Sequence, residues 1–336
     1  MLQKVLRLGL RKDNQYLKVN KIMELLKLSE VKTISSIGGG PIGGGWTAFF
    51  LSKGFNVVSY LHDKNEEDVF MKIVNTAWKS LEKLGLAENA SLKNLHITSE
   101  LEKALNGVHF VQESAPENLE LKQDLYSKMG QLLPNNIIIS SSTSGFMMSE
   151  IQARCSTPER TVIGHPFNPP YILPLVEVVG GKKTSKSAVQ WAFDFFKFSG
   201  KEPLILKKEV PGFIATRLQE ALWREALHMV DNGEATPSDI DKALINGPAP
   251  RMVVQGQCMA FHVACGEGGM ATNLDQFGPA LKWPWTRLQA PELTTELRDK
   301  MVNGCNEMAG DTNFEILASK RDEAIVSVLN ALKKKS

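Results

Sequence analysis

The feature that most constrains this chain is a glycine-rich turn between an apolar, β-branched segment (residues 31–37) and a helical one (residues 46–51). Its residues, in the spacing G-x-G-x-x-G, are Gly38, Gly39, Gly40, Pro41, Ile42 and Gly43. The spacing alone is a weak signal, but a preceding strand and a following helix make it typical of a dinucleotide site. Gly38 permits a tight turn, Gly40 lets the backbone approach a pyrophosphate, and the helix N-terminus offers free N–H groups. A plain strand–helix turn without a ligand is the alternative.

The rest of the first 207 residues favours an α/β fold. Further strand-like runs occupy residues 56–61, 108–111, 137–140, 161–164 and 175–179, and helical segments separate most of the early ones. This alternation predicts a doubly wound, Rossmann-type parallel sheet. Beyond about residue 207 only helical periods remain, and Thr236-Pro237 is typical of a helix start. We therefore predict a dinucleotide-binding domain over residues 31–207 and a mostly helical substrate and dimerisation domain over residues 208–336.

Residues 1–30 are read as an N-terminal extension of uncertain order. The segment is rich in Lys and Arg and has Asp13 as its one acid before Glu24. A transit peptide is the alternative, since such segments are basic and poor in acid.

Composition excludes several classes of partner. A formal charge of +2 over 336 residues, without a basic stripe interleaved with aromatics, argues against nucleic acid. No apolar run reaches the roughly 18 residues that a membrane-spanning helix needs. Four cysteines are too sparse for a disulfide framework and favour a cytoplasmic location. The expected partner is a small molecule.

Cys258, His262 and Cys265 follow i, i+4, i+7 spacing, which puts them on one face of a helix. They could bind a metal, but no fourth ligand is evident, and the surrounding residues are those of a buried apolar helix. We expect core packing and no metal.

Two polar residues in the apolar runs predict the chemistry. His165 closes one strand, and Glu177 lies inside the valine-rich run of residues 175–179. A buried carboxylate is costly unless it is partnered, and a histidine is its natural partner. The carboxylate would fix the imidazole tautomer and leave the other nitrogen as a base that takes a hydroxyl proton as hydride leaves carbon. A satisfied core histidine is the alternative.

The choice of nicotinamide cofactor depends on the end of the second strand. An acid there usually binds the ribose hydroxyls, but this chain has Leu61, with Asp63 two residues later. No Arg stands near to hold a 2′-phosphate, although Lys64 is close. NAD is favoured over NADP.

These motifs resemble the 3-hydroxyacyl-CoA dehydrogenase superfamily over roughly residues 31–308. The resemblance rests on Thr143-Ser144, the HPFNPP block of residues 165–170, the LVEVV block of residues 175–179 and the PGFI block of residues 211–214. It implies that Ser144 hydrogen-bonds the substrate oxygen and that His165 is the acid/base oriented by Glu177. The residues implied to contact NAD outside the glycine turn are Glu117, Lys122 and Asn168. A homodimer is also implied, and Thr216 stands where the family usually has Asn or Asp.

The C-terminal half is similar to the carnitine-oxidising members of that superfamily, at residues 222–227, 266–270, 276–281 and 288–293. This resemblance implies NAD-dependent oxidation of the C3 hydroxyl of L-carnitine to 3-dehydrocarnitine. Aromatic faces could hold its quaternary ammonium, and Arg251 could bind its carboxylate. The available aromatics are Phe146, Phe261, Trp283 and Trp285. The alternatives are a related dehydrogenase acting on L-gulonate or a 3-hydroxyacyl-CoA, and a crystallin-like, non-catalytic dinucleotide binder.

Overall fold

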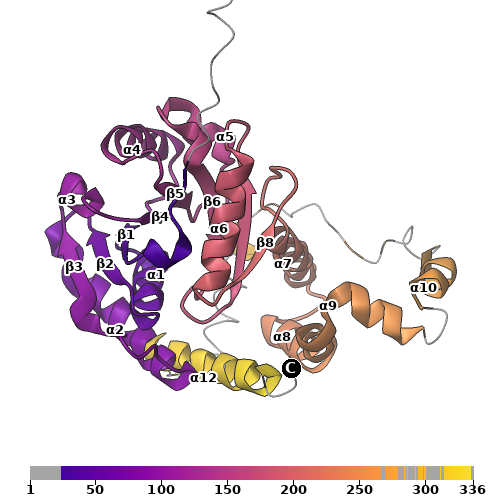
Figure 1. The fold of residues 1–336 in the computed structure, drawn as a ribbon. Helices are drawn as coiled ribbons and strands as arrows, with labels where there is room; N and C mark the ends of the chain where they lie inside the picture. Colours follow the sequence, from indigo (N-terminus) through magenta and orange to yellow (C-terminus); the bar gives the residue numbers. More distant parts are fainter. Residues whose placement is uncertain are drawn as a thin grey trace, which may run out of the picture.

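The computed structural model describes residues 24–265, 269–278 and 314–333, with residues 284, 286, 292, 294–297, 299 and 311. This part of the chain forms an eight-stranded sheet in the order β3-β2-β1-β4-β5-β6-β7-β8 (Figure 1). The strands are β1 (Thr33–Ile37), β2 (Asn56–Tyr60), β3 (Leu95–Thr98), β4 (Phe110–Glu113), β5 (Ile138–Ser141), β6 (Thr161–Pro166), β7 (Leu175–Gly180) and β8 (Glu202–Ile205).

The sheet is parallel from β3 to β6, and β7 then runs antiparallel to β6 with β8 parallel to β7. The predicted doubly wound sheet is therefore confirmed. Its order reverses between β1 and β4, the point at which ligands bind such sheets. β3 and β8 were not predicted, because these edge strands are half exposed and lack a continuous apolar run.

Helices cover both faces of the sheet. One face carries α1 (Pro41–Ser52), α2 (Glu67–Leu84) and α6 (Lys186–Phe198), and the other carries α3 (Leu101–Leu105), α4 (Leu119–Leu132) and α5 (Met148–Ile151). Successive strand residues supply the two cores, since side chains alternate across a strand: Ile138 packs in the first and Ile139 in the second. The short 3-10 helices are η2 (Leu28–Glu30), η3 (Lys64–Glu66), η4 (Leu92–Asn94), η5 (Gln152–Arg154) and η6 (Pro158–Arg160).

The beginning of α1 differs from expectation. The helix begins at Pro41 instead of near Trp46, so Gly43 lies in its first turn. Proline at the first helical position is favourable, because the N–H that it lacks has no partner within the helix. Gly54 follows this helix with φ +83°, as predicted for a helix stop.

Part of the predicted N-terminal extension packs on the first domain. The Leu26 carbonyl accepts a hydrogen bond of 2.6 Å from Trp191 Nε1, and Leu25 and Leu28 contact the core. Residues 1–23 lie outside the described residues.

The C-terminal part is helical where it is described. It comprises α7 (Ala215–Asp231), α8 (Pro237–Asn246), α9 (Pro248–Ala264), α10 (Gly269–Phe277) and α12 (Phe314–Lys333). Thr236 caps α8 as predicted, its side chain accepting from the Asp239 amide. In Figure 1, α12 returns to lie along α2. None of the described helices has the length and apolar character needed to cross a membrane.

The expected burial of the cysteine-bearing helix is wrong for the single chain. Among the described residues α9 packs mainly against α8 and α10, and no strand is among its main contacts. Cys258 is exposed, and Phe261 has 41% of its surface accessible. His262 Nδ1 accepts a hydrogen bond of 3.0 Å from the Met270 amide. Within the described residues, no group of three potential metal ligands comes together.

Candidate active site

His165 and Glu177 face each other across two antiparallel strands. They are direct register partners in the β6–β7 pair, which places their side chains next to one another on one face. His165 Nδ1 lies 2.9 Å from Glu177 Oε2. Glu177 is fully buried and His165 is 5% exposed. The predicted pairing of His165 with Glu177 is therefore present in the geometry.

The second oxygen of Glu177 is held by the start of α7. Glu177 Oε1 accepts hydrogen bonds from the backbone amides of Ile214 at 2.8 Å and Ala215 at 3.0 Å. Burial alone would raise the pKa of this carboxyl, but the hydrogen bonds from His165 and the two amides outweigh it and lower the pKa. Glu177 is thus held as an anion. Sequence reasoning did not identify these amides, since backbone donors have no sequence signature.

Aromatic side chains surround the imidazole. The Phe213 ring centroid is 5.1 Å from that of His165, and the Phe167 centroid is 6.0 Å away. Phe213 is buried and adopts φ +49°, a conformation that non-glycine residues seldom take. The residue after Ala215 is Thr216, in the first turn of α7. This apolar shell covers the pair and strengthens its electrostatic interaction.

Ser144 lies in the loop after β5, at the same edge of the sheet as the end of β6. Glu117 braces this loop: its Oε1 accepts from the Thr143 hydroxyl and, at 3.0 Å, from the Gly145 amide. Thr143 Oγ1 in turn accepts from the Phe146 amide at 3.1 Å. Ser144 is exposed between these anchored neighbours. Glu117, expected at the cofactor, also shapes the loop that carries Ser144.

A buried ion pair between Lys122 and Glu113 supports the Ser144 loop, because Lys122 also contacts Glu117. Lys122 Nζ lies 2.7 Å from Glu113 Oε1, 3.0 Å from the Ala115 carbonyl and 3.5 Å from Glu117 Oε2. Glu113 Oε2 accepts from the Ser141 hydroxyl at 2.6 Å. Lys122, also predicted to contact the cofactor, is 1% exposed and joins α4 to the end of β4, which Glu113 in turn links to β5 through Ser141. Glu113 was missed, although a carboxylate at the end of an apolar strand was an available signal.

The glycine turn opens onto a cavity of about 1290 Å³. Gly38 has φ +114°, and a Cβ built on it would lie 2.5 Å from the Ser114 carbonyl oxygen. A Cβ on Gly43 would lie 2.0 Å from the Gly38 carbonyl oxygen, so the helix starts in contact with the turn. Gly40, the residue that caps α1, has open space where a Cβ would be. These glycines leave the backbone accessible beside a helix N-terminus, which fits the pyrophosphate of a dinucleotide.

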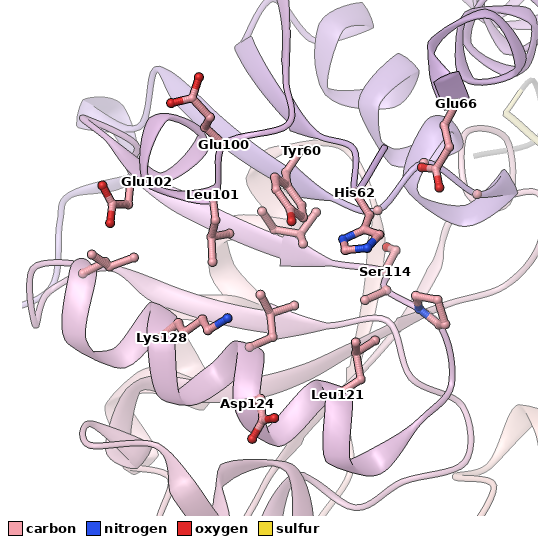
Figure 2. Close-up of a pocket in the computed structure, with 18 of the residues that line it drawn as sticks. Tyr60, His62, Glu66, Glu100, Leu101, Glu102, Ser114, Leu121, Asp124 and Lys128 are labelled. Carbon is pink, nitrogen blue, oxygen red and sulfur yellow. The ribbon is translucent and has the colours of Figure 1, made fainter. Parts of the chain in front are cut away.

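Figure 2 shows this cavity between the end of β2 and helix α4. Tyr60 and His62 come from the β2 side, and Leu121, Asp124 and Lys128 come from α4. The apolar side chains suit an adenine ring, and the polar ones lie around the cavity.

Three further residues that were predicted to contact the cofactor or the substrate lie in the described part of the chain. Asn168 is exposed in the turn after β6, beside the cis Asn168–Pro169 bond. Phe146 is half-buried and packs on the second core, in the Ser144 loop. Arg251 is exposed on α9, which in Figure 1 projects away from the sheet, so the single chain does not bring it to His165. Trp283 and Trp285 lie outside the described residues.

The fold and this site define an NAD-dependent dehydrogenase. Residues 33–210 match the 3-hydroxyacyl-CoA dehydrogenase NAD binding domain, and residues 212–308 match the 3-hydroxyacyl-CoA dehydrogenase C-terminal domain. The chain belongs to the 3-hydroxyacyl-CoA dehydrogenase family, as its motifs predicted.

Similar proteins narrow the family further. An L-carnitine dehydrogenase of Nocardiopsis dassonvillei is 50% identical over 90% of this chain and 92% of its own length. That of Pseudomonas putida is 45% identical over 91% of this chain and 95% of its own. Among solved structures, an NAD+ dependent dismutase, 5-formyl-3-hydroxy-2-methylpyridine 4-carboxylic acid 5-dehydrogenase, is 26% identical with a TM-score of 0.76, covering 90% of this chain and 99% of that one.

Proposed function

We propose that this protein oxidises the C3 hydroxyl of L-carnitine to 3-dehydrocarnitine with NAD. The observation that carries the proposal is the buried His165–Glu177 pair, in a chain that matches relatives named L-carnitine dehydrogenases over nine-tenths of its length. The pair supports the assignment of the acid/base group, and the similarity to those relatives supports L-carnitine as the substrate.

His165 removes the proton in this mechanism. Glu177 accepts the Nδ1–H hydrogen bond, so Nε2 is the unprotonated nitrogen that takes the proton of the C3 hydroxyl. The anionic carboxylate then stabilises the imidazolium that forms. Ser144 donates a hydrogen bond to the substrate oxygen and holds it beside His165. The chemistry that bound NAD would supply is acceptance of the hydride from C3.

The other residues predicted to bind NAD have the following roles in the proposed reaction. The glycine turn from Gly38 to Gly43 would hold the pyrophosphate, while Glu117 and Asn168 would lie toward the nicotinamide. Lys122 would act by fixing Glu117, because its ammonium is already bonded within the protein.

Contacts to the two charged ends of L-carnitine are proposed with Phe146 and Arg251. Phe146 is supported by its place two residues after Ser144, where its ring could meet the quaternary ammonium. Arg251 is supported by its charge alone, which suits the carboxylate, since the described part of the single chain leaves it away from His165.

We also propose a cytoplasmic homodimer. Helices α7 to α10 expose large apolar side chains, among them Leu218 at 65% and Leu274 at 55%, which a second copy would cover. The described cysteines Cys155, Cys258 and Cys265 are unpaired, which suits a reducing compartment. Light scattering at micromolar concentration tests the dimer, and a monomer mass would overturn it.

NADH absorbance tests the reaction. We expect purified protein to reduce NAD with L-carnitine and not with D-carnitine, L-gulonate or 3-hydroxybutyryl-CoA. His165→Ala should abolish turnover and leave NADH binding intact, whereas His96→Ala, at an exposed histidine of β3, should change neither. Absence of L-carnitine oxidation would refute the substrate, and turnover surviving in His165→Ala would refute the role of the base.

A further inference from the structure

We propose that Glu66 provides the ribose-binding carboxylate of this cofactor site and thereby selects NAD over NADP. The usual position of that acid, at the end of the second strand, holds Leu61. The inference rests on the use of NAD in the proposed function, but it concerns only the adenosine half of the cofactor.

Leu61 has a packing role that rules it out as a ligand. It is 1% exposed and belongs to the first core. Its Cδ2 lies 2.9 Å from the point where a Cβ on Gly39 would be, so it supports the glycine turn from beneath. Its aliphatic side chain has no hydrogen-bond acceptor, so a ribose-binding carboxylate must come from another residue.

Asp63 is the nearest acid in sequence, but its side chain is engaged. Asp63 Oδ1 accepts a hydrogen bond of 3.0 Å from the Asn65 amide and caps η3. That bond lowers the pKa of the Asp63 carboxyl, in keeping with an anion fixed in a cap. Asp63 is not among the described residues that line the cavity, whereas Asn65 and Glu66 are.

Glu66 brings its carboxylate back to the glycine turn. It is the last residue of η3, one 3-10 turn beyond Asp63, and it is exposed to the cavity. Its Oε2 lies 3.0 Å from the point where a Cβ on Gly39 would be. Figure 2 shows the carboxylate beside the cavity on the same side as His62. A carboxylate at the second glycine of the turn is placed to accept hydrogen bonds from ribose hydroxyls.

The charged side chains around the cavity also favour NAD over NADP. Glu66, Glu100, Glu102 and Asp124 line it, and Lys128 on α4 is the one described lining residue with a permanent positive charge. Glu100 and Asp124 are paired with Lys103 and Arg154, which do not line the cavity, so the negative charge beside the glycine turn comes mainly from Glu66. A 2′-phosphate would bring about two negative charges into this surrounding, beside Glu66. The same carboxylate that binds two hydroxyls therefore repels the phosphate, which is the basis of discrimination.

Direct binding separates this proposal from catalysis. The probes are ADP-ribose and its 2′-phosphate, measured by isothermal titration calorimetry on the full chain. For Glu66→Gln we expect ADP-ribose to bind about tenfold more weakly, the loss typical of a charged hydrogen bond. The 2′-phosphate should bind as well as before or better, so the ratio of the two dissociation constants narrows by at least about tenfold. The matched control is Glu67→Gln, at the adjacent exposed acid that does not line the cavity.

Each outcome decides one proposal. An unchanged ratio in Glu66→Gln, or the same change in Glu67→Gln, overturns the role of Glu66. Wild-type protein that binds the 2′-phosphate more tightly than ADP-ribose overturns it as well. A wild-type protein that shows the Glu66-dependent preference but does not oxidise L-carnitine refutes the proposed substrate and leaves the role of Glu66 supported.

Discussion

Replacing Glu177 with Gln tests the chemistry of the site at one atom. The glutamine has the shape of the native side chain, and its Oε1 can keep the hydrogen bonds from the Ile214 and Ala215 amides. Its NH₂ group then faces His165 Nδ1, where the native acceptor lies at 2.9 Å. A donor at this position forces the imidazole to carry its proton on Nε2, which is the nitrogen that must act as the base.

The expected loss combines two effects. A charge-assisted hydrogen bond is worth about 1.5–3 kcal/mol, and the imidazolium that forms during the reaction loses it. Selecting the wrong tautomer adds a further cost, and the same change in a serine protease triad lowers kcat about 10⁴-fold. Together we expect about 4–5.5 kcal/mol in the activation free energy, or about 10³–10⁴ in kcat. The melting temperature should change by only a few degrees, because shape and backbone contacts are retained.

The assay is initial-rate NADH formation with L-carnitine, alongside fluorescence titration of NADH binding. Glu209→Gln is the matched control, since the Glu209 carboxylate accepts two hydrogen bonds from Ser149. It should keep most of its activity. A kcat within about tenfold of wild type in Glu177→Gln would refute the orienting role, since it corresponds to less than about 1.4 kcal/mol. A parallel loss of NADH binding would instead attribute the fall in kcat to disruption of the fold.

Three further changes have defined outcomes. Gly38→Ala should lower the unfolding free energy by at least about 2 kcal/mol and weaken NADH binding, because φ is +114° and the new Cβ would lie 2.5 Å from the Ser114 oxygen; urea unfolding checks it. Lys201 is buried with its ammonium on the Pro170 and Leu173 carbonyls, and burial holds its pKa well below 10.5. Because the unfolded chain binds that proton more strongly, the unfolding free energy should rise as pH increases from the folded pKa toward 10.5, and Lys201→Met should flatten this rise in urea titrations at several pH values. The pKa of Glu177 is lowered from 4.5, so its contribution to stability is present above pH 4.5 and lost as pH falls through the folded value; the stability gap between wild type and Glu177→Gln should shrink on acidification, and a constant gap would contradict this reasoning.

The buried surfaces explain which elements could be predicted from sequence. Continuous apolar runs such as residues 137–140 mark strands covered on both faces, and those positions were identified within a residue or two. The edge strands β3 and β8 escaped, because a strand covered on fewer sides needs fewer apolar residues. The helix bearing Cys258 misled for the opposite reason: its apolar residues predict burial but do not say which molecule covers them.

The sequence by itself determined the dinucleotide turn, the doubly wound sheet and the choice of His165 with Glu177. These follow from local backbone requirements and from the cost of placing a carboxylate inside an apolar strand. Only the tertiary structure decided that the two side chains meet at 2.9 Å, because that depends on β7 running antiparallel to β6 in one register. It also decided that the Ile214 and Ala215 amides hold Glu177, and that Glu66 lies at the glycine turn where Leu61 cannot serve. Such contacts join residues distant along the chain, and local sequence carries no record of them.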